Sequence, residues 1–150
     1  MTDEEYMQLA LEEAQKALNE KEIPIGAVLV YQDMVIASGH NRSESTFDPT
    51  SHAEIEVIRA SSHFLSRWRL TDCRLYVTIE PCPMCSGAIM AARIGQLIYG
   101  ASNPQYGGID SRFHIAEDGV LNHTLAVRFG ILEKQCQKIM DDFFFLRRGV

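Results

Sequence analysis

Two cysteines stand three positions apart in the segment Cys82-Pro83-Met84-Cys85. Pro83 predicts that a helix starts here, and the positive end of a helix dipole lowers the pKa of a nearby thiol and favours the thiolate. Thiolates bind metal ions or perform redox chemistry, so the pair is compatible with half of a zinc site or with a thioredoxin-like dithiol. A purely structural pair is the third possibility.

A histidine and a carboxylate begin a second predicted helix, at His52-Ala53-Glu54. Because residues i and i+2 of a regular helix point about 200° apart, His52 and Glu54 can share a site only if His52 lies at the helix cap. We therefore predict that this helix begins at His52 or Ala53. The competing interpretation is a capping box, since Ser51 and Glu54 have the S-x-x-E spacing.

His52, Cys82 and Cys85 together offer three ligands of the softness that zinc prefers. Three protein ligands with an open fourth position are typical of catalytic zinc, whereas a structural site has four ligands. Other histidines could in principle close the site, although none has a ligand-like spacing to the first three: His40, His63, His114 and His123. We therefore expect one Zn²⁺ whose fourth position is left for water.

The pattern H-x-E followed by P-C-x-x-C resembles the zinc-dependent nucleobase deaminases of the cytidine deaminase-like family. Further segments, spread over nearly the whole chain, resemble the bacterial tRNA adenosine deaminases: Pro24-Ile25-Gly26-Ala27-Val28, Asn41, Asp48-Pro49-Thr50, Leu75-Tyr76-Val77-Thr78, Gly87-Ala88-Ile89, Arg93-Ile94, Asn122-His123 and Phe143-Phe144-Phe145-Leu146-Arg147-Arg148. The resemblance implies that His52, Cys82 and Cys85 hold zinc and that Glu54 carries protons. It implies hydrolytic deamination of adenosine to inosine at the wobble position of a tRNA anticodon loop, with release of ammonia.

The resemblance also assigns substrate-binding roles to Asn41, Ala53 and Asn103. For Asn41, an ordinary turn residue is the alternative. The tRNA deaminases usually carry Asp where Asn103 stands, close to the substrate ribose. Asn lacks the full charge and can donate as well as accept, so we expect looser discrimination of the ribose 2′-hydroxyl, and hence of RNA from DNA. The segment 107–111 departs from the family's usual loop as well.

The C-terminal segment Phe143-Phe144-Phe145-Leu146-Arg147-Arg148 combines aromatic rings with guanidinium groups, which can stack on unpaired bases. Helical spacing favours a core position for Ile139, Phe143 and Leu146, which leaves the other aromatic and arginine side chains for RNA or a partner subunit. The family is homodimeric, with an RNA groove that involves both subunits. The resemblance therefore implies a homodimer that binds a tRNA anticodon stem-loop.

The elements that must position these residues follow from hydrophobic periodicity and turn signals. We expect helices over 3–20, 51–62, 83–95 and 133–148, and strands over 25–31, 34–38, 75–79, 96–99 and 124–128. Helices that alternate with strands after an opening hairpin predict a mixed five-stranded sheet with helices on both faces, the three-layer α/β/α arrangement. Ligands in such sheets gather where strands end and helices begin, and both chemical segments lie at such junctions.

Length and composition set the outer bounds. The chain has 150 residues, of which 46% are hydrophobic and 23% charged, so we expect one globular domain over residues 1–150. Four cysteines and an acidic N-terminus predict a cytoplasmic protein, and no apolar run is long enough for a membrane helix. The net charge of −6 argues against a polyanionic partner, but most of it comes from the first twenty residues.

Three other functions stay open on the sequence alone. A deaminase of a free nucleobase such as guanine would use the same zinc centre, and the acidic charge would suit it. A thiol oxidoreductase that uses Cys82 and Cys85 would bind no metal and would reduce insulin. A zinc-stabilised binding module would keep its activity after Glu54→Gln, whereas the enzyme would lose it.

Overall fold

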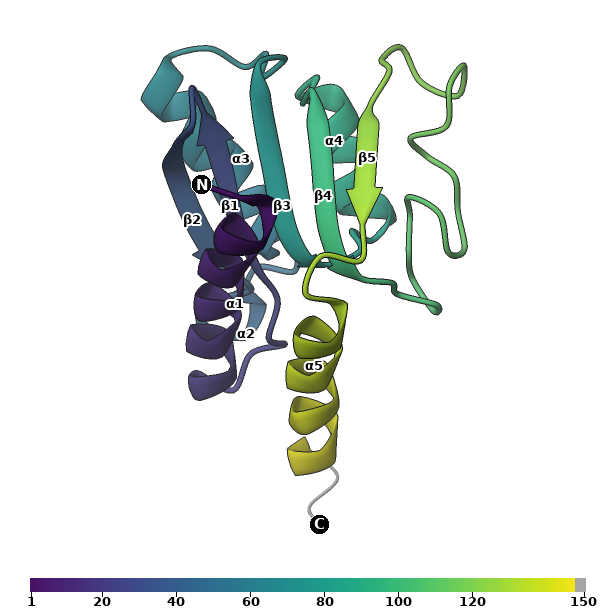
Figure 1. The fold of residues 1–150 in the computed structure, drawn as a ribbon. Helices are drawn as coiled ribbons and strands as arrows, with labels where there is room; N and C mark the ends of the chain where they lie inside the picture. Colours follow the sequence, from purple (N-terminus) through teal and green to yellow (C-terminus); the bar gives the residue numbers. More distant parts are fainter. Residues whose placement is uncertain (148–150) are drawn as a thin grey trace.

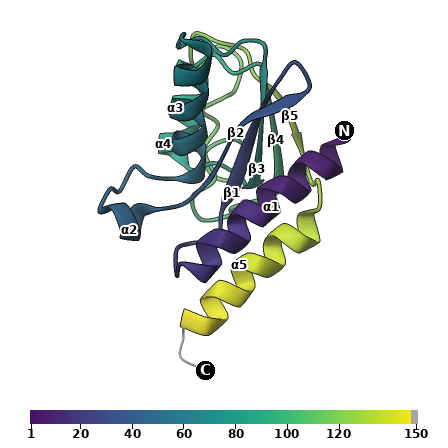
Figure 2. The same cartoon turned by 90° about the vertical axis from the view of Figure 1, so that its left-hand side faces the viewer.

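The computed structural model describes residues 1–147 as a mixed five-stranded sheet between two layers of helices (Figure 1). The strands, in sheet order, are β2 (Met34–His40), β1 (Gly26–Tyr31), β3 (Cys73–Ile79), β4 (Gln96–Ala101) and β5 (Ala126–Phe129). The helices are α1 (Asp3–Asn19), α2 (Ser43–Thr46), α3 (Ala53–Leu65), α4 (Pro83–Ala91) and α5 (Glu133–Arg147). Seen along the sheet, α1 and α5 cover one face, while α3 and α4 cover the other (Figure 2). The predicted three-layer fold is confirmed.

The strand directions decide where the functional segments meet. β1 is antiparallel to both β2 and β3, whereas β3, β4 and β5 run parallel. The carboxyl ends of β2, β3 and β4 therefore lie at one edge of the sheet. The chain leaves these ends at Asn41, Glu80 and Ser102, which brings three segments far apart in the sequence to the same edge.

The core has two parts, one on each face of the sheet. Side chains from α3 and α4 pack on one face around Leu75, Val77 and Leu97. On the other face, Tyr6 and Met7 of α1 pack on a second set of strand side chains with Cys136 of α5. Because β1, β3 and β4 are covered on both faces, they have the nearly continuous apolar sequences that the strand predictions used.

Local interactions define the start of α1 and the turn between β1 and β2. The backbone N–H of Glu5 donates to Thr2 Oγ1 at 3.2 Å, which caps α1. The turn between β1 and β2 places Gln32 and Asp33 at φ 51° and 59°, the left-handed conformation that a two-residue hairpin turn requires. None of the helices in residues 1–147 is both long and apolar enough to span a bilayer.

Several predicted element boundaries differ from those of the structure by a few residues. α4 ends at Ala91 and does not continue to Gly95, because Arg93 takes a left-handed φ of 60° and its guanidinium donates to the Met90 and Ala91 carbonyl oxygens. α3 continues past Ser62 to Leu65. Residues 39–50, between a predicted strand and a predicted helix, were expected to form a loop, but they contain α2, whose N-terminal N–H groups donate to the distant Glu22 carboxylate.

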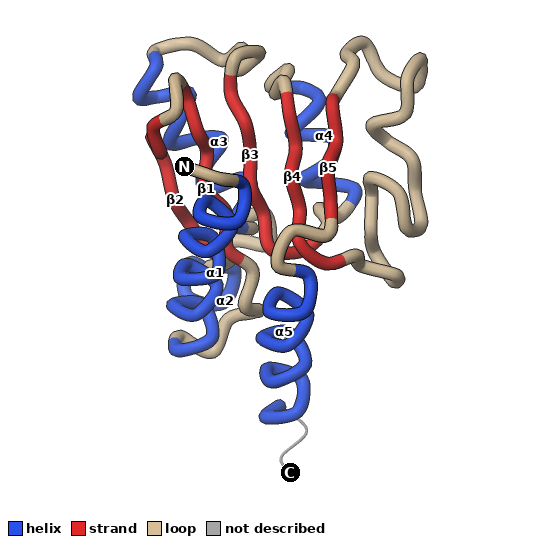
Figure 3. Tube along the Cα trace, viewed as in Figure 1, coloured by secondary structure: helices blue, strands red, loops and turns tan. Residues whose placement is uncertain are grey.

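The C-terminal helix extends well beyond the edge of the sheet (Figure 1). Its predicted last residue, Arg148, lies outside the described residues. The segment between β4 and β5, residues 102–125, contains no helix or strand and forms a long excursion beside the sheet (Figure 3).

Candidate active site

His52 lies at the start of α3 in an extended conformation, as expected for a residue at the helix cap. The helix begins at Ala53, and His52 is its N-cap with φ −85° and ψ 157°. The alternative capping box does not form: the Ser51 hydroxyl donates to Glu56, and no side chain caps the helix. Because His52 does not have helical backbone angles, its side chain can face the same site as that of Glu54.

The two cysteines approach His52 from the beginning of α4. Cys82 is the N-cap of this helix, Pro83 opens its first turn, and Cys85 is buried one turn later. His52 Nδ1 lies 3.6 Å from Cys82 Sγ and 3.5 Å from Cys85 Sγ, and the three ligand atoms all lie within 4.8 Å of one another. Tetrahedral zinc, with bonds of about 2.0 Å to nitrogen and 2.3 Å to sulfur, separates such atoms by about 3.6 Å. The donor set fits this ion.

The protonation states of this cluster are set by its own hydrogen bonds. A hydrogen bond from the Cys85 thiol lowers the pKa of Cys82 to about 4, and the His52 imidazole adds to this effect. The same bond to Cys82, together with burial, raises the pKa of the Cys85 thiol. The hydrogen bond to Cys82 also raises the pKa of His52. The three ligand atoms thus lie close enough to alter one another's pKa, and close enough to bind one divalent cation together.

Glu54 lies beside this cluster with its carboxylate removed from water. Its residue is 3% exposed, and its Oε1 atom is buried without a hydrogen-bond partner. Burial raises the pKa of Glu54 to about 7. A buried, unpartnered carboxylate oxygen destabilises the fold, so its position is best explained by a ligand or a reaction that uses it.

Asn41 reaches the site from the end of β2. Its Oδ1 atom accepts a hydrogen bond of 2.8 Å from the backbone N–H of Ala53, and the residue is 4% exposed. This bond fixes the amide plane at the start of α3 and turns the NH₂ group away from the Ala53 N–H. Ala53 itself contributes its backbone N–H to Asn41, and its side chain is fully buried.

A cavity of 370 Å³ connects this region with the C-terminal helix. Its lining includes Asn41 and His52 on one side and Phe143, Phe144 and Arg147 of α5 on the other. Phe143 and Ile139 are buried, as predicted, whereas Leu146 is 64% exposed. The prediction for Leu146 is wrong because this end of α5 extends past the sheet and has no strand to pack on.

Asn103 follows β4 and lies in a second cavity, of 290 Å³, between the start of the 102–125 segment and α5. Its Oδ1 atom accepts a hydrogen bond of 3.1 Å from the backbone N–H of Tyr106, so the side chain stabilises a local turn. Phe144 lines this cavity as well as the one beside Asn41 and His52. The exposed ring of Phe144 thus lies between the two predicted substrate-binding asparagines.

No fourth His, Cys, Asp or Glu joins the cluster within residues 1–147, and two of the other histidines have partners elsewhere. Both ring nitrogens of His40 face carboxylates, at 2.9 Å from Glu13 and 3.0 Å from Glu20. His123 bonds the Ile94 carbonyl oxygen. The three residues that the sequence singled out as zinc ligands therefore lie together.

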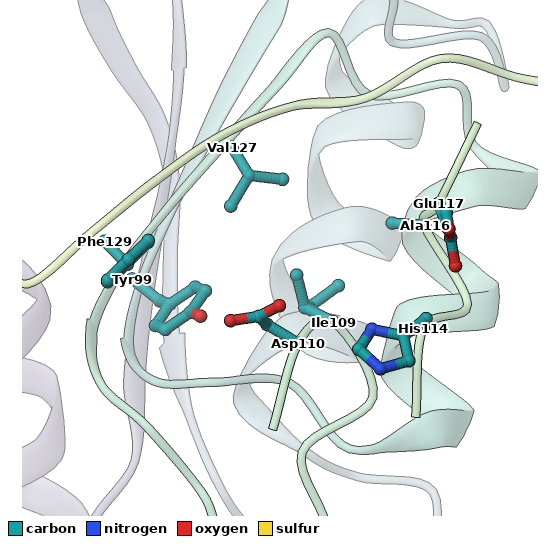
Figure 4. A pocket seen from close by; sticks show the side chains of 8 residues that line it. All are labelled: Tyr99, Ile109, Asp110, His114, Ala116, Glu117, Val127 and Phe129. Atoms are coloured by element: carbon teal, nitrogen blue, oxygen red, sulfur yellow. The ribbon is translucent and has the colours of Figure 1, made fainter. Parts of the chain in front are cut away.

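Another pocket, of 610 Å³, lies between β5 and the 102–125 segment and includes none of the cluster residues. Figure 4 shows the Asp110 carboxylate and the Tyr99 hydroxyl pointing towards each other across it, with His114 further along the wall. Burial raises the pKa of Tyr99 to about 12, and the charges of Glu80 and Asp110 add to the shift. The lining of this pocket thus combines apolar residues with the acidic residues Asp110 and Glu117.

Glu80, two positions before Cys82, is a buried residue near the cluster that no sequence motif indicated. It is 2% exposed and accepts hydrogen bonds from the 102–125 segment. The sequence feature that could have indicated Glu80 is its position: it is a carboxylate directly after a predicted buried strand and directly before Pro81-Cys82. A charged residue at that position has to find partners inside the fold.

Comparison with known proteins agrees with this geometry. A family profile described as MafB19-like deaminase matches residues 1–148. A tRNA-specific adenosine deaminase of Streptococcus pyogenes serotype M1 is 48% identical over 139 residues, which cover 93% of this chain and 81% of that protein.

Solved structures agree as well. One from a study of A-to-I editing by tRNA:A34 deaminases at the wobble position superposes with a TM-score of 0.87 at 43% identity, over 90% of this chain and 98% of that one. A guanine deaminase from Bacillus subtilis superposes with a TM-score of 0.65 at 40% identity, over 68% of this chain and 66% of that one. The chain belongs to the MafB19-like deaminases and, within them, to the tRNA-specific adenosine deaminase family.

Proposed function

We propose that this chain hydrolyses adenosine to inosine at the wobble position of a tRNA anticodon loop, with one Zn²⁺ per subunit held by His52, Cys82 and Cys85. The observation that carries the proposal is the convergence of these three ligand atoms beside the buried Glu54 carboxylate, whose Oε1 atom has no hydrogen-bond partner. The tRNA-specific relatives supply the substrate class.

Zinc, when bound, supplies a Lewis acid that brings the pKa of water towards ~7. Glu54 accepts the proton that the attacking water gives up at C6 of adenine. It returns that proton to the ring nitrogen and helps to protonate the leaving amine, so that adenosine and water become inosine and ammonia. Burial suits Glu54 to this work, because a carboxyl with a pKa of about 7 can both take and return a proton near neutral pH.

Asn41 and Ala53 act together in substrate binding under this proposal. The Ala53 N–H occupies Asn41 Oδ1, so the amide NH₂ is the group that can meet an acceptor on the purine. Asn103 would lie near the ribose. The exposed side chains of Phe144 and Phe145 would stack on bases of the unpaired loop.

Two further parts of the proposal concern the cellular compartment and the oligomeric state. Zinc binding needs Cys82 and Cys85 as thiolates and not as a disulfide, which fits a reducing cytoplasm, and all four cysteines are free. A homodimer would let the exposed end of α5 and a partner subunit form one RNA groove.

The direct test incubates the purified protein with total tRNA and with an anticodon stem-loop that contains adenosine at the wobble position, and sequences the product for inosine. Inosine should form at that position alone. Glu54→Gln should reduce the rate by at least about 10²- to 10⁴-fold, the usual contribution of a general acid or base, with zinc content unchanged. Glu56→Gln, whose carboxylate faces Ser51, is the matched control and should retain activity.

The guanine deaminase of Bacillus subtilis supports a second candidate, since 40% identity extends over two thirds of this chain. Release of ammonia from guanine without inosine in tRNA would favour that candidate. A protein that binds no zinc and reduces insulin would instead be a dithiol oxidoreductase, and the deaminase proposal would be wrong.

A further inference from the structure

A single buried carboxylate, that of Glu80, binds the first part of the segment that follows β4 through several hydrogen bonds. Its side chain accepts hydrogen bonds from four backbone N–H groups and one hydroxyl across a separation of 23 to 31 positions. The backbone donors are Asn103 at 3.1 Å, Ile109 at 3.2 Å, Asp110 at 2.8 Å and Ser111 at 2.9 Å, and the hydroxyl is that of Ser111. We call residues 103–111 the Glu80-bound loop.

The loop packs on Glu80 more closely than a side chain would permit. A Cβ added at Gly107 would lie 2.5 Å from the Glu80 carboxylate, and one at Gly108 would lie 2.5 Å from Ser86 Oγ and 3.0 Å from the Cys82 carbonyl. The Gly108 N–H also donates to the Pro81 carbonyl oxygen at 2.8 Å. The two glycines therefore let the loop lie directly on the turn that carries Cys82.

The outer side of the same loop faces the region where substrate is expected. Its first residue, Asn103, lines the cavity that Phe144 also lines, together with Pro104 and Gln105. Long segments without helix or strand have few contacts of their own to hold them, so the position of Asn103 depends on what anchors the loop. Here that anchor is Glu80, two positions before the metal ligand Cys82.

We propose that Glu80 is a positioning residue for substrate: by binding the 103–111 loop it fixes Asn103 and its neighbours relative to the Cys82 turn. The inference rests on the proposed function for its substrate, a tRNA anticodon stem-loop. Glu80 takes no part in proton transfer. Its effect is on where the stem-loop docks, and therefore on KM more than on kcat.

The first test is Glu80→Gln. An amide offers one acceptor oxygen and a donor NH₂, so it cannot accept from both ends of the loop, and the NH₂ group faces N–H donors. We expect KM for the stem-loop to rise by about 10-fold or more, kcat to stay within about three-fold, and zinc content to remain at one per chain. Hydrogen exchange at the Ile109, Asp110 and Ser111 amides should accelerate.

Ser111→Ala is a milder variant that can be measured in its place if Glu80→Gln fails to fold. It removes only the hydroxyl donor and should raise KM by a smaller factor in the same direction. Gly107→Ala disturbs the same contact from the loop, because the added Cβ would force the Glu80 carboxylate to move. If both act through the same contact, the effects on KM of Glu80→Gln and Gly107→Ala should not multiply in the double variant.

Asp3→Ala is the control that destabilises the protein without disturbing the loop. Asp3 accepts from Tyr76 and Arg128 on the sheet face that α1 covers, away from the loop. It should lower the melting temperature with KM unchanged. An unchanged KM in Glu80→Gln, a loss of zinc, or multiplicative effects in the double variant would each overturn the positioning role.

The two proposals can fail separately. If the unmodified protein forms no inosine in tRNA, the proposed function is wrong. Hydrogen exchange in Glu80→Gln still decides whether the carboxylate anchors the loop, and unchanged exchange at residues 109–111 would show that it does not.

Discussion

The two ends of the Asn41 amide have different roles: the oxygen stabilises the fold, and the NH₂ group is left for the proposed substrate. Its oxygen is committed to the Ala53 N–H, so only its NH₂ group is available to a purine. Asn41→Asp keeps an oxygen for Ala53 and removes the donor. We expect kcat/KM for the stem-loop to fall by about 5- to 150-fold, the effect of about 1–3 kcal/mol, while the melting temperature changes little. A fall in stability equal to that of Asn41→Ala would contradict this division.

Asn103 offers the matching test of sugar recognition. Its Oδ1 atom accepts from Tyr106, and a carboxylate could accept the same bond, so Asn103→Asp should preserve the local turn. We expect the substitution to raise the preference for an RNA hairpin over a DNA hairpin of the same sequence, because a charged acceptor binds the 2′-hydroxyl more strongly. The measurement is the ratio of turnover on the two hairpins. An unchanged ratio would reject a role for Asn103 in this discrimination.

At the level of elements, β1 passes so close to α1 that only glycine fits where they meet. A Cβ at Gly26 would overlap the carbonyl oxygen of Ala10 and would lie 2.5 Å from the backbone nitrogen of Ala14. Backbone atoms of a helix cannot move aside as a flexible side chain can. Gly26→Ala should therefore destabilise the protein by about 1–3 kcal/mol, measured by urea unfolding. Gly87→Ala, whose Cβ would meet nothing within 4 Å, is the control.

A charged contact joins α1 to the end of β2, next to Asn41. Burial would raise the pKa of Glu13, but hydrogen bonds from His40 and Lys16 lower it below its ordinary value of 4.5. A carboxyl with a lowered pKa stabilises the fold fully above its unfolded pKa, and this stability is lost as pH falls through the folded pKa.

We therefore expect Glu13→Gln to be less stable than the unmodified protein at neutral pH and to lose less stability between about pH 5 and pH 3. Urea unfolding over this range measures both. Glu12→Gln, at the exposed neighbouring position, is the control. Parallel pH curves for Glu13→Gln and the unmodified protein would contradict the assignment.

At the scale of the whole molecule, the proposed metal would join two helices from separate parts of the chain. His52 begins α3 and both cysteines belong to the start of α4, so zinc would stabilise the native state by mass action. With free zinc at about 100 times Kd this is roughly 2.7 kcal/mol, or a melting temperature higher by roughly 5–10 °C.

A chelator should remove this increment and added zinc should restore it, as scanning calorimetry would show. In Cys82→Ser the melting temperature should respond far less to either treatment. Equal responses of the two proteins would place the stabilising metal elsewhere.

The sequence by itself determined the chemistry of the site, because that chemistry is local. Two cysteines in the first turn of a helix converge by helix geometry alone, and His52 and Glu54 can face one site only from a helix cap. The apolar runs of the buried strands likewise identified the sheet. These inferences needed no knowledge of distant contacts.

Only the tertiary structure decided what depends on contacts between distant segments. Antiparallel β1 and parallel β3 and β4 bring Asn41, Cys82 and Asn103 to one edge, a result of strand order that periodicity does not encode. Leu146 has the spacing of a core residue, but α5 extends past the sheet there. The partners of Glu80 lie 23 to 31 positions away, so its role depends on the folded path of the chain and not on its neighbours in sequence.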